Sequence, residues 1–110
     1  MADERKRFLV FTSPTEEGMK NPPPAKAFQA QIDFMKDAVA DGIIEFAFHG
    51  DGHAVLIVDA ETREALEKFL GAIPLSEFMQ RKIEPLEDLF AQMGRVHAWL
   101  VDNDKKLGRG

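Results

Sequence analysis

Two strand-like runs separated by a tight turn constrain the fold of this chain more than any other feature. Residues 43–48 and 54–59 are rich in β-branched and aromatic side chains, which favour strands. Asp51-Gly52 lies between them, and this dipeptide is a strong short-range signal for a β-hairpin. The sequence therefore predicts an antiparallel pair of strands near the middle of the chain.

The segments on either side of the hairpin complete an alternating order of elements. Residues 7–12 (RFLVFT) and 78–84 (FMQRKIE) read as two more strands, and the proline-rich segment 13–24 reads as a long loop. Residues 25–40 carry apolar side chains at steps of three and four, which indicates a helix. A second helical stripe, capped by Asp59 or Thr62 and ended by Pro74, is formed by Leu66, Phe69, Leu70 and Ile73. The order β-α-β-β-α-β predicts an α+β, ferredoxin-like domain over residues 1–86 with a four-stranded antiparallel sheet.

Residues 87–110 form a C-terminal extension beyond this domain. Its apolar residues fit one helical stripe, but Gly94 allows a second interpretation, in which a short helix stops before a strand over residues 95–102. We expect one or two helical segments. Because the extension carries Trp99, Leu100 and Val101, we expect it to pack on its own domain or on a neighbouring chain.

Composition excludes several classes of function. A formal net charge of −5 opposes binding to nucleic acid phosphates. The absence of cysteine excludes disulfides, thiolate nucleophiles and zinc-thiolate sites, and it fits a cytoplasmic protein. The N-terminal sequence MADERKRFLVF has too short an apolar run for a signal peptide or a spanning helix. No phosphate-binding glycine loop, serine elbow or zinc helix motif occurs in the sequence, so we expect no cofactor and no membrane association.

The stretch VDAETREALEKFLGAIPLSEFMQRKIEPL, residues 58–86, resembles the muconolactone isomerase-like branch of the dimeric α/β-barrel superfamily. The matching elements are Asp59, Thr62, Ile73-Pro74-Leu75, Phe78-Met79 and Glu84-Pro85-Leu86. The resemblance implies that two such sheets pack face to face as a homodimer, sometimes built into a larger ring. It also implies proton transfer on a small organic acid or lactone. We carry over no catalytic residue from the family, because strand 7–12 and the first helix are mostly apolar where the family has polar or charged positions.

His49 and His53 flank the predicted turn, and an imidazole suits both proton transfer and metal binding. If Asp51-Gly52 alone form the loop, the two rings point to opposite faces of the hairpin; if residues 50–52 form it, they lie side by side. Metal sites usually need three or more ligands, so we predict no metal site. Glu45 lies in an otherwise apolar strand, where it is a candidate general base or the partner of a cation such as Arg81 or Lys82.

Two functional hypotheses follow. In the first, the chain is a cofactor-free isomerase that acts on a small hydrophobic organic acid or lactone held between sheet and helices, with His49, His53 and Glu45 as candidate catalytic residues. In the second, it is a non-catalytic homo-oligomeric module that binds a small ligand or supports assembly.

Overall fold

The computed structural model describes residues 6–109, and these residues form one antiparallel sheet with helices on one face. The strands are β1 (Lys6–Pro14), β2 (Ile44–His49), β3 (Ala54–Ala60) and β4 (Met79–Pro85), arranged in the order β2-β3-β1-β4. All three pairs of neighbouring strands are antiparallel. This topology confirms the predicted ferredoxin-like α+β fold.

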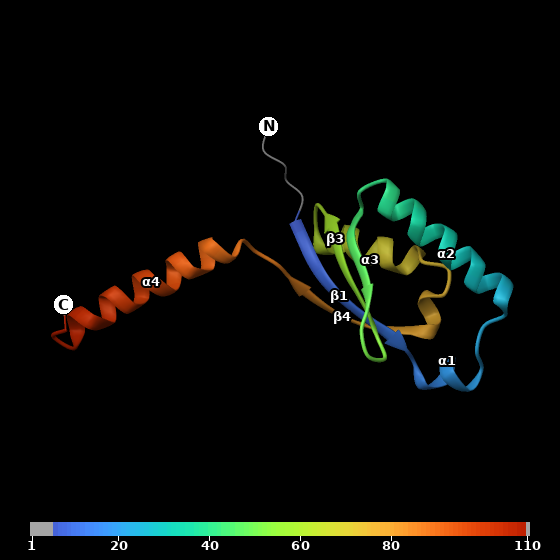
Figure 1. Ribbon diagram of the computed structural model, residues 1–110, viewed down its shortest axis with the longest axis horizontal. Helices are drawn as coiled ribbons and strands as arrows, with labels where there is room; N and C mark the ends of the chain where they lie inside the picture. The colour runs from blue at the N-terminus through green and yellow to red at the C-terminus, as the bar shows by residue number, and fades with distance from the viewer. Residues whose placement is uncertain (1–5, 110) are drawn as a thin grey trace.

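Helices α2 (Ala25–Ala40) and α3 (Arg63–Ala72) lie on the same side of the sheet (Figure 1). Burial alternates along β1 and β3, so every second side chain points into the core. The most deeply buried side chains are those of Val10, Ile44, Val58, Leu66 and Leu70. Thr62 caps α3 by accepting a hydrogen bond from the amide of Ala65 at 3.0 Å, which confirms one of the two expected caps.

The opposite face of the sheet, which we call the open face, carries no helix. Strand pairing puts Leu9 opposite Ile57 and Phe11 opposite Val55, so their side chains line this face. Phe46 and Phe48 of β2 add two stacked rings with centroids 6.3 Å apart. These two rings are 53% and 66% exposed, which leaves a large apolar surface in contact with solvent.

The segment expected to be a plain loop contains a short helix, α1 (Glu16–Lys20). Thr15 caps it by accepting from the amide of Gly18 at 2.9 Å, and the amide of Thr15 donates to the carbonyl of Phe78 at 2.8 Å. Phe78 closes the 3₁₀ turn η1 (Ser76–Phe78) immediately before β4. The hydrogen bond between Thr15 and Phe78 therefore holds the proline-rich segment next to the start of β4.

The C-terminal extension is a single helix, α4 (Leu89–Lys106), and Gly94 does not end it. Figure 1 shows α4 running away from the sheet, and none of its residues is buried. The radius of gyration is 19.1 Å, whereas a compact chain of this length has about 13 Å. The first five residues of the predicted domain and the last residue of the extension lie outside the described residues.

Candidate functional site

The hairpin between β2 and β3 adopts the register with the shorter loop. The amide of Gly50 donates to the carbonyl of His53 at 2.7 Å, and His49 pairs with Ala54. Gly52 has a φ of 77°, a conformation that glycine adopts without a steric penalty. Because Asp51 and Gly52 alone form the loop, His49 points to the helix side of the sheet and His53 to the open face.

A cleft of about 340 Å³ lies between the hairpin, α2 and the segment around α1. We call it the hairpin cleft. Its apolar walls include Phe28 of α2 and Phe78 and Met79 at the start of β4. His49 borders the cleft from the helix side, and His53 borders it from the turn. A volume of this size suits a small ligand, since ligand sites usually measure about 300 to 1,000 Å³.

His53 is held in place by contacts outside the helix layer. Its Nδ1 atom lies 2.9 Å from the carbonyl oxygen of Asp51. The ring is tilted against that of Phe11, with centroids 5.7 Å apart. Since Phe11 lies on the open face, His53 contacts that face as well as the hairpin cleft, whereas His49 points to the helix side.

A smaller hollow of about 90 Å³ shares walls with the hairpin cleft, among them Thr12, Gln31 and Met79. Arg81 also lines this hollow, and its Nη1 atom donates to the hydroxyl of Ser76 at 2.9 Å. The cleft and the hollow are thus neighbouring, mostly apolar cavities, with His49 at the first and Arg81 at the second.

Glu45 lies at the far end of the sheet from both histidines. A bulge in β2 between Ile44 and Phe46 leaves Glu45 outside the regular pairing, and its Oε2 atom accepts a hydrogen bond from Nε of Arg7 at 2.5 Å. Oδ1 of Asp59 lies 3.8 Å from the same nitrogen. The expectation that Arg81 or Lys82 serves as the partner of Glu45 is wrong, because Arg7 faces it across the bulge.

The environment of Glu45 favours its ionised form. The hydrogen bond from Arg7, followed by the interaction with Asp59, holds the pKa of Glu45 below its ordinary value of 4.5. A carboxylate with a lowered pKa is a weaker base. Glu45 is also about 13 Å along β2 from His49, at about 3.3 Å per residue. The three candidate residues therefore do not form one catalytic group.

Within residues 6–109, no group of three or more potential ligands is arranged to hold a metal ion. In the same residues, no helix combines the length and the apolar character that crossing a membrane requires. Sequence reasoning named neither Gln31 nor Arg7 as a site residue. Gln31 accepts a hydrogen bond from the amide of Leu75 at 3.1 Å. The sequence signal that could have identified Gln31 is its amide side chain on an otherwise apolar face of α2.

Comparison with known proteins places this geometry in a wider context. No model of a known protein family matches the sequence, and no curated protein matches it. The structure is similar to the crystal structure of muconolactone isomerase, with a TM-score of 0.56 and 23% sequence identity. The match covers 74% of this chain and 88% of that chain. The chain has a muconolactone isomerase-like fold.

Proposed function

We propose that this chain is a cofactor-free isomerase that binds a small hydrophobic organic acid or lactone in the hairpin cleft. The carrying observation is the apolar cleft of about 340 Å³, which His49 borders and which shares walls with the hollow that Arg81 lines. Convergent polar groups in an apolar pocket are the usual mark of a ligand site. The structural likeness to muconolactone isomerase supports the choice of this reaction class.

Arg81 and His49 take separate roles in this proposal. Arg81 lines the inner hollow, where its guanidinium group would bind a carboxylate through paired N–H donors. His49 borders the cleft, where its imidazole would take a proton from one carbon of the ligand and return it to another. The composition of the ligand is unchanged by this transfer, so the reaction needs no oxidant and no second substrate.

The test compares His49 with a histidine that lies outside the hairpin cleft. A panel of unsaturated carboxylic acids and lactones is screened for binding by calorimetry and for isomerisation by NMR. His49→Ala should lower turnover by about 10²- to 10⁴-fold, the usual contribution of a general acid or base. His97→Ala is the matched control, because this imidazole lies on α4 and does not line the hairpin cleft, and it should retain turnover within a small factor.

Arg81→Gln separates ligand binding from proton transfer. We expect weaker binding of carboxylic acids and little change for neutral lactones, because only the former need the guanidinium group. Equal turnover of His49→Ala and the unaltered chain would contradict the proposed mechanism. Failure of the correctly folded chain to bind any compound of the panel would contradict the proposed ligand class.

The second candidate function is a homo-oligomeric assembly module, and the open face favours it. Phe46 and Phe48 are both more than half exposed on this face, beside the apolar side chains of β1 and β3. We propose that two copies pack their open faces together, because apolar burial contributes about 25 cal/mol per Å² removed from water. This pairing is compatible with a ligand in the hairpin cleft, which lies on the helix side of the sheet.

A further inference from the structure

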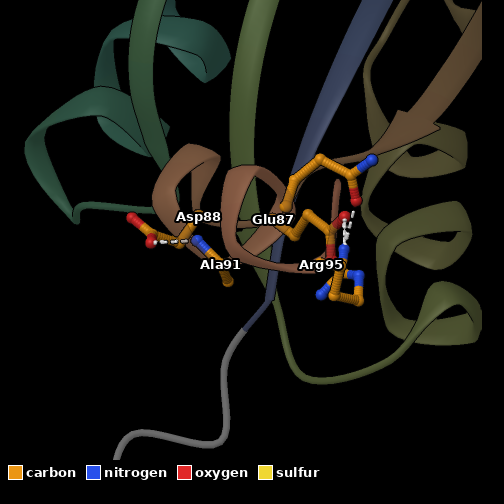
Figure 2. A network of polar contacts seen from close by, with 5 residues as sticks. Glu87, Asp88, Ala91 and Arg95 are labelled. Atoms are coloured by element: carbon orange, nitrogen blue, oxygen red, sulfur yellow. Dashed lines mark hydrogen bonds and ion pairs between the residues drawn. The ribbon is translucent and has the colours of Figure 1, made fainter. Parts of the chain in front are cut away.

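Helix α4 presents an apolar surface that the described part of its own chain does not cover. Leu89, Met93 and Trp99 are 63%, 53% and 61% exposed, and no residue of α4 is buried. Large exposed apolar patches usually mark interaction sites. The helix is nevertheless well defined at its start, where Asp88 accepts from the amide of Ala91 at 3.0 Å and Glu87 contacts Arg95 (Figure 2).

The spacing of the apolar residues identifies the kind of surface that fits α4. Five of them follow one another at steps of four, three, four and seven, namely Leu89, Met93, Val96, Leu100 and Leu107. Asn103 occupies the position that divides the step of seven. A narrow seam with an average repeat of 3.5 residues is typical of a helix that packs along another helix.

The charges at the two ends of α4 select the orientation of that second helix. The start carries the acidic Glu87 and Asp88. The end carries Lys105, Lys106 and Arg109, which outnumber Asp102 and Asp104 beside them and leave that end positive. An antiparallel arrangement of two copies brings the acidic start of each helix beside the basic end of the other. A parallel arrangement brings like charges together and aligns the two helix dipoles unfavourably.

We infer that α4 pairs with α4 of a second copy of this chain in an antiparallel, two-fold symmetric contact. Matching the acidic start with the basic end centres the contact near Val96 and His97 and puts Met93 opposite Leu100 of the second copy. A self-complementary surface of this kind is what a two-fold interface requires. The inference rests on α4 alone and is independent of the ligand proposed for the hairpin cleft.

Single cysteines test the contact directly, because the natural chain contains none. Val96→Cys lies at the centre of the predicted contact and should give a disulfide-linked dimer under mild oxidation. Leu89→Cys lies near one end, where an antiparallel pair separates the two sulfurs by more than about 20 Å. Ala98→Cys lies close to the centre in sequence but on the opposite side of the helix. Neither control should link.

Each alternative arrangement or partner of α4 predicts a different outcome of these experiments. Equal linking of Leu89→Cys and Val96→Cys would mean a parallel pair and would overturn the inferred orientation. No linking of Val96→Cys, together with an unchanged mass in Leu100→Glu by sedimentation, would exclude a pair of α4 helices. Sedimentation of the unaltered chain with anionic lipid vesicles, lost in Leu100→Glu, would assign the seam to a membrane surface instead.

Discussion

Arg7, near the start of the central strand β1, shows how one residue can favour the ionised form of a neighbouring carboxyl group. It stands opposite Asp59 in the pairing of β1 with β3, and it also binds Glu45 through the bulge in β2. The bulge turns the side chain of Glu45 toward the guanidinium group of Arg7. No sequence pattern predicts a bulge of this kind. The pairing of Arg7 with Glu45 therefore could not be predicted from the sequence.

The lowered pKa of Glu45 predicts a pH dependence of stability. A carboxyl whose pKa is lower in the folded than in the unfolded state contributes stability above its ordinary pKa, and that contribution is lost as the pH falls through the folded value. Glu45→Gln should therefore lower the melting temperature at pH 7, and the difference should shrink below pH 4.5, the ordinary value of the group. Thermal melts of both chains from pH 7 to pH 3 measure this. A difference that grows on acidification would contradict the assignment.

For the individual helices and strands, apolar periodicity and turn residues were sufficient to predict most of the fold from the sequence. Helix α2 begins and ends where its apolar stripe predicts, and the Asp51-Gly52 turn lies between β2 and β3. The short helix α1 was missed, because five residues are too few for a periodic signal and three prolines follow them. The cleft was also beyond prediction, since its walls come from segments about 65 residues apart.

Gly18 is where α1 touches the start of β4. A Cβ added at Gly18 would lie 2.7 Å from the carbonyl oxygen of Phe78, a separation that forces the backbone apart. Gly18→Ala should lower the free energy of unfolding by about 1 to 3 kcal/mol, as overpacking usually does. Denaturant titration measures the change.

Gly71→Ala is the matched control for Gly18→Ala. Gly71 lies in α3 with nothing within 4 Å of an added Cβ. Because alanine is the better helix former, this change should raise the free energy of unfolding by up to about 1 kcal/mol. Equal destabilisation by both substitutions would show that α1 is not packed against Phe78.

The whole molecule presents three separate surfaces for contact: the hairpin cleft, the open face and the seam of α4. The sheet divides the first two, and the third extends beyond the domain, so that the described residues span 65 Å along the longest axis. The sequence indicated that apolar surface remained to be covered, because a four-stranded sheet with helices on one side leaves the other side bare. It did not indicate that α4 would point away from its own domain, because that direction depends on the three residues that join β4 to α4.

Phe48→Asp tests the pairing of open faces. Its ring is 66% exposed, so the substitution should leave the fold intact while placing a charge in the proposed interface. We expect the mass measured by light scattering to fall relative to the unaltered chain at the same concentration. Val39→Asp, which alters an exposed apolar residue on α2, is the control and should leave the mass unchanged. Identical masses for Phe48→Asp and the unaltered chain would argue against this interface.

The three histidines of the chain lie at these surfaces in different combinations. His49 borders the hairpin cleft, His53 borders the same cleft and contacts Phe11 of the open face, and His97 flanks the seam of α4. Imidazole protons resonate in an uncrowded region of the NMR spectrum, and the chain has three histidines in all. The protein thus carries natural spectroscopic probes at each surface. Adding a ligand should move the His49 and His53 resonances but not those of His97, and dilution should move those of His53 and His97, so a single sample can distinguish ligand binding from assembly.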